Sequence, residues 1–280
     1  MGKIAVVTDS TADLPAPVRE KYDIKMVPLQ VHLAGEDYRD WVDIEPEDFL
    51  ARMKTASELP TTSQPPVGRF VELYRSLAEN YRRVVSIHLP EALSGTVESA
   101  RLAADMVDEI DIEVIDSGKV TGALGEMVVR IAQRVESDGE VEEIKSLVEE
   151  LKDRIKLYFT LDSLDYLEAG GRIGKASAFL GNLFNVRPVL TLAAGEVVPC
   201  KKVRGEKRLY KDLDRLVAKQ LEAKGGESLV ILHGTEREKA DKLKEVLTAN
   251  YSWSEVKIRS FGPVIASHVG YNPFGAVVVN

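Results

Sequence analysis

Strand-like apolar segments alternate with helical segments through the first half of the chain, and this alternation is the strongest constraint on its fold. Strands separated by helices form parallel βαβ units, whose helices cover both faces of the sheet. The sequence therefore predicts an α/β fold with a parallel sheet in this half. The predicted strands are Ile4–Val7, Met26–Leu33, Val84–His88 and Ile112–Ile115, and the predicted helices are Pro15–Lys21, one opening at Ile44–Phe49, Val67–Glu79, Thr96–Val107 and Val120–Val135.

The second half differs, since two of its predicted strands follow each other directly. Ala193-Ala194-Gly195 between them has the composition of a hairpin turn, which makes the strands antiparallel. We expect an α+β domain with a mixed or antiparallel sheet, and domains spanning 1–153 and 154–280. The predicted strands are Lys156–Leu161, Val186–Leu192, Glu196–Val203, Leu229–His233 and Val256–Ser260, and the predicted helices are Glu140–Asp153, Asp162–Glu168, Lys207–Ala223 and Arg237–Ala249.

The composition predicts an ordinary soluble protein and limits its partners. Of 280 residues, 44% are hydrophobic, and the net charge of −8 argues against nucleic acid, which requires a basic face. No stretch approaches about 18 uncharged apolar residues, so no membrane span is expected. The N-terminus has no signal-peptide pattern, which predicts a cytoplasmic protein. The single cysteine, Cys200, rules out an internal disulfide.

Three turns rich in hydroxyl groups follow apolar segments, at Thr8–Thr11, Pro60–Pro66 and Leu93–Thr96. Ligands of parallel sheets bind beyond the carboxyl ends of strands, and short hydroxyls beside free backbone N–H groups suit an anion. The segment Pro60–Pro66 is polar and bounded by prolines, so we expect a surface or cleft loop. None of the turns has a His or Cys beside it, which favours binding of an anion over nucleophilic chemistry.

Helix capping is the alternative role for the same hydroxyls. Thr62 or Ser63 could cap the helix that begins at Val67, and Ser94 could cap the helix near Thr96. Capping and anion binding are compatible, because both use the N–H groups at a helix N-terminus. Ser94 lacks the flanking glycines of a nucleophile elbow.

A glycine turn at Gly170-Gly171 precedes Arg172 and is predicted to present this arginine to an anion or partner, with Lys175 as a second candidate. The P-loop pattern is not met there, because Ala176 stands where Ser or Thr is required. The four histidines are dispersed, so no metal site is expected. His268 lies among small residues and is either a structural or a functional histidine.

Six motifs in this order resemble the DegV family of bacterial fatty-acid-binding proteins, over essentially the whole chain. The motifs are Thr8–Pro15, Pro60–Pro65, Leu93–Thr96, Leu164–Leu167 with Gly170–Ile173, Arg187–Leu190 and Gly262–Ile265. The resemblance implies a two-domain protein that holds one long-chain fatty acid, such as palmitate, between its domains without a cofactor.

The resemblance also implies roles for individual residues. Thr62 and Ser94 match the residues that hydrogen-bond the carboxylate, and Arg172 and His268 match residues beside the head group. Some members are the binding subunit of a fatty acid kinase, and Arg204 resembles a residue linked to that step. Further residues are expected near the head group or the kinase-facing surface, namely Ser10, Thr61 and Gly95.

Two other functions remain open from the sequence. Ser94 with His268 as base could form a serine acyl hydrolase or transferase, and the basic segment Lys201–Arg208 could dock an acidic partner in a regulator or scaffold. The apolar wall of the expected site is predicted only loosely, with these candidates: Phe159, Phe179, Leu180, Leu183, Phe184 and Ile265.

Overall fold

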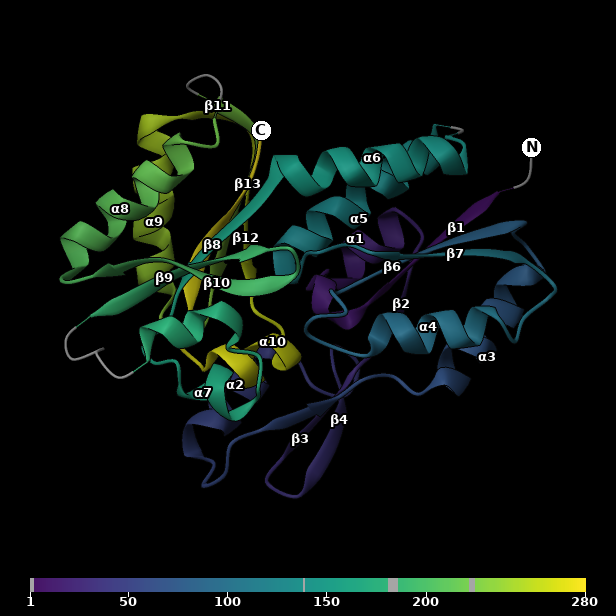
Figure 1. Cartoon of the computed structure of the whole chain (residues 1–280), viewed down its shortest axis with the longest axis horizontal. Helices are drawn as coiled ribbons and strands as arrows, with labels where there is room; N and C mark the ends of the chain where they lie inside the picture. The colour runs from purple at the N-terminus through teal and green to yellow at the C-terminus, as the bar shows by residue number, and fades with distance from the viewer. Residues whose placement is uncertain (1–2, 138, 181–185, 222–224) are drawn as a thin grey trace.

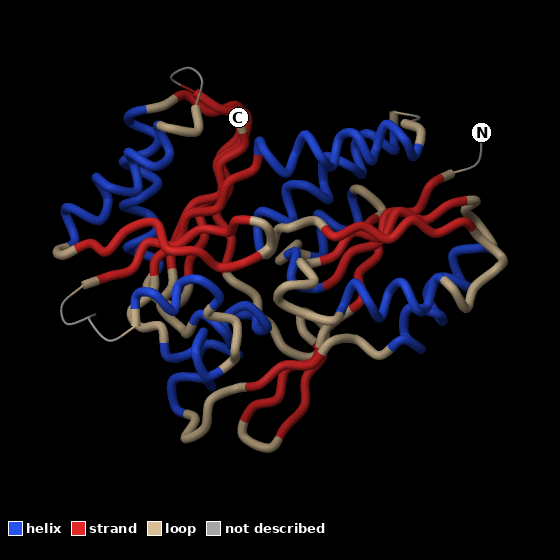
Figure 2. Tube along the Cα trace, viewed as in Figure 1, coloured by secondary structure: helices blue, strands red, loops and turns tan. Residues whose placement is uncertain are grey.

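The computed structural model describes residues 3–137, 139–180, 186–221 and 225–280. Two large sheets lie side by side, and a small sheet lies below them in the view shown (Figure 1, Figure 2). The mixed α/β architecture and the two-part arrangement are those that the sequence predicted. None of the helices in these ranges is both long and apolar enough to cross a membrane.

The first large sheet is wholly parallel, with strand order β2-β1-β6-β7. Val7 of β1 packs with α3 and α4 on one face, whereas its neighbour Val6 packs toward α5 on the other. Both faces are therefore buried, as parallel strands require. The elements are β1 (Ile4–Asp9), β2 (Ile24–Val27), β6 (Arg83–His88), β7 (Asp111–Asp116), α1 (Ala16–Lys21), α3 (Val67–Ala78), α4 (Thr96–Ala104) and α5 (Thr121–Glu136), with a 3-10 turn η1 (Ser10–Ala12) after β1.

The second large sheet is mixed, with strand order β10-β9-β8-β13-β11-β12. Only β11 and β12 are parallel among these pairs, and the predicted β9–β10 hairpin is confirmed. Helices α8 and α9 cover one face, and α5 and α6 lie against the other. The elements are β8 (Ile155–Thr160), β9 (Arg187–Ala193), β10 (Glu196–Val203), β11 (Gly225–His233), β12 (Ser252–Ser260), β13 (Phe274–Val279), α6 (Val141–Arg154), α8 (Glu206–Ala218) and α9 (Arg237–Asn250).

The small sheet is antiparallel, with order β4-β3-β5, and the sequence did not predict it. Its apolar side packs with α2 and with α10, a helix from the far end of the chain. The C-terminal segment therefore closes against the N-terminal part of the molecule. The elements are β3 (Gln30–Leu33), β4 (Glu36–Arg39), β5 (Thr61–Ser63), α2 (Pro46–Thr55) and α10 (Pro263–Val269), with α7 (Asp165–Ala169) and the 3-10 helix η2 (Gly174–Phe179) nearby.

Several predicted elements are wrong in detail. The single strand expected over Met26–Leu33 is two strands in different sheets, divided at Pro28, which has no N–H for a ladder. The loop expected at Pro60–Pro66 contains the strand β5, because β3 supplies a partner that local sequence cannot show. Thr62 and Ser63 do not cap α3, whose N-cap is Pro66 without a side-chain bond. Strand β13 and helix α10 were not predicted.

Helix α5 lies between the two large sheets and belongs to a hydrophobic core that both share. Its buried residues point in nearly all directions, so it has no solvent-facing stripe over most of its length. Leu124 of α5 is fully buried in this core, with Ile87 of the first sheet and Val277 of the second. The boundary near residue 153, at the end of α6, stays a prediction, since the core continues across it.

Leu124→Ala is expected to lower the free energy of unfolding by about 2–5 kcal/mol, because it leaves a cavity in this shared core. Leu102→Ala on α4 is the matched control, because Leu102 is 47% exposed. Urea unfolding followed by circular dichroism measures both. Equal, small losses for the two variants would contradict a core centred on α5.

Candidate functional site

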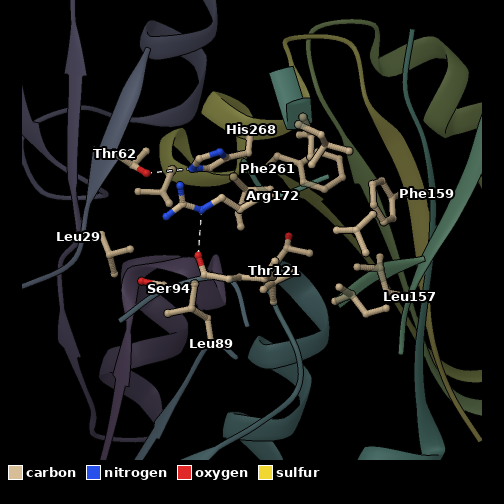
Figure 3. A pocket seen from close by; sticks show the side chains of 18 of the residues that line it. Leu29, Thr62, Leu89, Ser94, Thr121, Leu157, Phe159, Arg172, Phe261 and His268 are labelled. Carbon is tan, nitrogen blue, oxygen red and sulfur yellow. Dashed lines mark hydrogen bonds between the residues drawn. The ribbon is translucent and has the colours of Figure 1, made fainter. Parts of the chain in front are cut away.

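A cavity of about 330 Å³ opens where the two large sheets and the small sheet meet (Figure 3). This volume lies within the range of roughly 300–1,000 Å³ found for small-molecule sites. Its walls come from segments spread along the chain between Leu29 and Val269, so no single motif defines it. Among the described residues it is lined by Leu29, Thr62, Ser63, Gln64, Leu89, Leu93, Ser94, Val120, Thr121, Leu157, Phe159, Leu167, Arg172, Leu192, Val197, Phe261, Val264, Ile265, His268 and Val269.

Most of the cavity wall is apolar. Leu157 and Phe159 of β8 lie at one end in Figure 3, away from the polar side chains. Phe159 and Ile265 are confirmed as lining residues. Phe179 and Leu180 are not among the lining residues, and the Phe179 ring instead lies 4.8 Å from the Lys202 ammonium. The remaining two candidates, Leu183 and Phe184, lie outside the described residues.

Thr62 and His268 meet at the polar end of the cavity. Strand alternation turns Thr62 of β5 inward and leaves Thr61 exposed. The Thr62 Oγ1 lies 2.9 Å from His268 Nε2 on α10, 206 positions away in sequence. This pairing, drawn in Figure 3, joins the small sheet to the C-terminal segment at the cavity.

Arg172 connects the glycine turn to the loop that carries Ser94. Gly171 has a φ of +70°, a conformation that glycine adopts without strain and that turns the chain before Arg172. The Arg172 Nε donates to the Leu93 carbonyl at 3.0 Å, and Nη1 donates to the Gly170 carbonyl at 2.6 Å. Within the described residues Nη2 has no hydrogen bond, so the guanidinium retains a donor for a ligand.

Ser94 lies on the loop between β6 and α4, opposite Thr62 across the polar end. Its Oγ is 2.9 Å from the Thr96 Oγ1 and accepts a longer bond of 3.3 Å from the Thr96 N–H. A side chain at Gly95 would collide with the Gln64 carboxamide, which donates to Ser99 on α4 at 2.8 Å. Gly95 therefore lets the Thr62 strand approach the Ser94 loop.

His268 is held neutral in this site. Burial, together with the smaller effect of the positive charge of Arg172, lowers its pKa to about 4. Its Nδ1 is buried without a hydrogen-bond partner, and a side chain at Gly170 would collide with this atom. Because the imidazole is neutral, Arg172 supplies the positive charge at this end of the cavity. A ligand group with one negative charge would be attracted to it.

The geometry offers little support for the hydrolase hypothesis. His268 Nε2 bonds to Thr62, and Ser94 Oγ bonds to Thr96, so Ser94 and His268 do not form the nucleophile–base pair that this hypothesis requires. No acidic residue lines the described cavity to orient the histidine. Over the described ranges, no group of three or more His, Cys, Asp or Glu side chains is arranged to hold a metal.

The other predicted residues lie outside this cluster. Ser10 is buried below it, where its Oγ accepts the Leu29 N–H at 3.0 Å and so places one wall residue. Arg204 is exposed and lines a separate depression with Gly205 and Lys239. In the basic segment Lys201–Arg208, Lys201 is paired with the buried Asp212 at 2.7 Å, which reduces its charge.

Sequence analysis missed part of the site. Thr121, at the start of α5, lines the cavity although it follows no hydroxyl-rich motif, and its φ of +50° is unusual for a β-branched residue. Gln64 was part of a motif but had no assigned role. Phe261 and Val264 lie on either side of Gly262-Pro263, and this Gly-Pro motif was the available sequence signal for this part of the cavity wall.

The fold and the cavity together define a class of two-part α/β proteins with a cavity where their sheets meet. A family model described as "uncharacterised protein, DegV family" matches residues 3–280, so the chain belongs to the DegV family. The protein DegV of Bacillus subtilis is 39% identical over 277 residues, which cover 97% of each chain.

Solved structures give the same assignment. A Thermus thermophilus protein, described as showing fatty acid binding of a DegV family protein, superposes with a TM-score of 0.94 at 35% identity over 99% of each chain. B. subtilis DegV, described as a fatty acid binding protein, gives 0.89 at 37% identity over 100% of each chain. A Eubacterium ventriosum protein described as stearic acid-binding gives 0.87 at 28% identity, covering 99% of this chain and 98% of that one.

The lowered pKa of His268 predicts how stability depends on pH. The pKa of His268 is about 4 in the folded protein and 6.5 when unfolded, so folding favours the neutral ring. The contribution of His268 to the free energy of unfolding is therefore fully present above pH 6.5 and is lost as pH falls toward 4. At about 1.4 kcal/mol per pKa unit, the loss is on the order of 3 kcal/mol.

Urea unfolding of the ligand-free protein at several pH values across this window measures the effect. His268→Gln is expected to flatten the pH dependence between about pH 4 and 6.5. Parallel curves for wild type and His268→Gln would show that His268 is not buried as a neutral group.

Proposed function

We propose that this protein binds one long-chain fatty acid, with the acyl chain in the apolar part of the cavity and the carboxylate at its polar end. The observation that carries the proposal is an apolar cavity that ends in two hydroxyls, a neutral imidazole and an arginine. Relatives described as fatty acid binding share its fold over nearly their whole length. The proposed function needs no cofactor or metal.

In this proposal the carboxylate is bound by Thr62 and Ser94 and neutralised by Arg172. The two hydroxyls come from opposite sides of the cavity, and Arg172 lies between them in Figure 3. Hydrogen bonds to a charged group contribute about 1.5–3 kcal/mol each. His268 acts through Thr62, because its Nε2 fixes the direction of that hydroxyl.

The acyl chain supplies most of the binding free energy. Burial of each CH₂ contributes about 0.8 kcal/mol, so a chain of about fourteen methylenes offers on the order of 10 kcal/mol before ordering costs. The polar end therefore sets the orientation of the ligand rather than most of its affinity. Thr62→Val and Ser94→Ala test this division between chain and head group.

Each substitution is expected to raise the dissociation constant for palmitate by roughly 10- to 100-fold, the equivalent of one lost charged hydrogen bond. Displacement of a fluorescent fatty acid measures the constant, and solvent extraction with mass spectrometry measures the ligand retained on purification. Thr61→Val is the matched control, because Thr61 is the exposed neighbour on the same strand.

Unchanged affinity in both Thr62→Val and Ser94→Ala would rule out the carboxylate assignment while leaving chain binding intact. A wild-type protein that binds no fatty acid would contradict the function itself. Release of acid from an activated acyl ester, abolished by His268→Ala, would favour the serine hydrolase instead.

We further propose that the bound fatty acid is presented to the catalytic subunit of a fatty acid kinase in the cytoplasm, where the kinase forms acyl phosphate. In this proposal, exposed Arg204 faces the kinase from outside the cavity.

Arg204→Glu is expected to leave the palmitate dissociation constant unchanged and to lower acyl phosphate formation by about tenfold or more when a fatty acid kinase subunit and ATP are added. Lys219→Glu, at the exposed end of α8, is the control for added negative charge on this domain. Equal rates for wild type and Arg204→Glu would contradict the docking role.

A further inference from the structure

Three strained residues meet at one buried carboxyl beside the cavity. Asp13, Trp41 and Thr121 have φ values of +48°, +61° and +50°, in a region that non-glycine residues rarely adopt. The Asp13 carboxyl accepts hydrogen bonds from the Trp41 Nε1 at 3.1 Å and from the Thr121 Oγ1 at 2.6 Å. Strained backbone persists only where surrounding contacts hold it, and such residues gather at ligand clamps and switches.

The same carboxyl holds the start of α10. It lies against Gly262, where an added side chain would collide with both Asp13 and the Trp41 indole. Asp13 therefore joins three separate parts of the molecule: the start of α5 through Thr121, the small-sheet region through Trp41, and α10 through Gly262.

A second buried carboxyl, Asp40, lies against the same helix. Its Oδ1 accepts the Val264 N–H at 3.4 Å, and its Oδ2 is buried without a partner. Burial raises the pKa of Asp13 to about 7, and burial together with the charge of Asp13 raises the pKa of Asp40 well above its usual value. Two such carboxyls in contact with one element resist becoming charged together.

Helix α10 is a wall of the cavity, so its position affects the ligand directly. Val264, Ile265, His268 and Val269 all line the cavity from this helix. A shift at its first turn would move both the apolar wall and the Thr62–His268 contact.

We propose that Asp13 and Asp40, here called the carboxyl clamp, hold α10 against the bound ligand while the pair carries at most one negative charge, and that the ligand leaves faster when both are ionised. The inference rests on the proposed function, because the ligand concerned is the acyl chain in the cavity. Neither aspartate lines the cavity, so both are positioning residues.

The charges around the clamp set this limit of one negative charge. Arg259 is the cation that faces Asp13, and its side chain is 7% exposed. It is shared with Glu126, whose carboxylate lies 3.7 Å away. Asp9 is a further acidic group that acts on Asp40, and its carboxylate lies 3.0 Å from the His88 ring.

Arg259 can thus offset one ionised aspartate, whereas a second charge would repel the first in a site with little water. The sign of the pH effect follows from the raised pKa values. A carboxyl whose folded-state pKa lies above its unfolded value contributes stability at low pH that is lost as pH rises through the folded pKa. Ionisation of Asp13 near pH 7 gives the pair its first negative charge, and the clamp should therefore loosen as pH rises further and Asp40 ionises as well.

Trp41 reports on the clamp without any ligand. The chain has two tryptophans, so Trp253→Phe leaves Trp41 as the sole fluorophore. Its emission is expected to titrate with a midpoint near pH 7, because its indole donates to Asp13. Asp13→Asn, which keeps a hydrogen-bonding side chain of the same shape, should abolish this transition.

The ligand test measures the dissociation rate of a fluorescent long-chain alcohol, which has no carboxyl to titrate, from about pH 6 to about pH 8.5. The wild-type rate is expected to rise at least about fivefold over this range, because one ionisation that favours the loosened state can change its population up to tenfold per pH unit. Asp13→Asn and Asp40→Asn should both give flat profiles.

Asp212→Asn is the matched control, since Asp212 is a buried aspartate on α8 that lies outside the cavity. It should keep the wild-type slope even if it lowers stability. A flat wild-type profile, or a wild-type slope retained in both clamp variants, would overturn the clamp. If the wild type binds neither the alcohol nor palmitate at any pH, the proposed function fails and the clamp with it.

Discussion

The packing of helix α5 between two sheets is the interaction on which the rest of the molecule depends. Two glycines of α5 allow this close packing. A Cβ atom at Gly122 would lie 3.1 Å from Leu232 of the second sheet, and one at Gly125 would lie 3.1 Å from Leu14, which follows β1 of the first sheet. Because α5 is buried on both sides, the two sheets share one core. Its N-terminus is therefore fixed at the point where the sheets diverge, and Thr121 becomes part of the cavity wall.

The cavity follows from this arrangement. Two sheets held apart by a helix leave space beyond its end, and the small sheet with α10 closes that space. Since α10 comes from the end of the chain and β5 from its first quarter, the polar end forms only when the whole chain has folded. The apolar end of the site is built on residues of the shared core, whereas the polar end depends on the contacts that α10 makes with distant segments.

Burial shifts the pKa values of the titratable groups around the cavity toward their neutral forms. His268 has a lowered pKa of about 4 and Asp13 a raised pKa of about 7, both mainly because burial disfavours the charged form. Arg172 is thus the charged side chain at the polar end of the cavity. The same desolvation that prepares the site for an anion makes its supporting contacts sensitive to pH.

The sequence by itself determined the parallel first sheet, the mixed second sheet and the turns that carry Ser94 and Arg172, because periodicity and turn composition are local properties. Tertiary structure alone decided that Thr62 forms a strand and meets His268, since strand β5 needs β3 as its partner and α10 as its cover. Tertiary structure also brings Trp41 and Thr121 to the Asp13 carboxyl. The local sequence around each of these residues does not predict this contact. Contacts between distant segments depend on how the sheets pack around α5, and pattern within a short window carries no information about that packing.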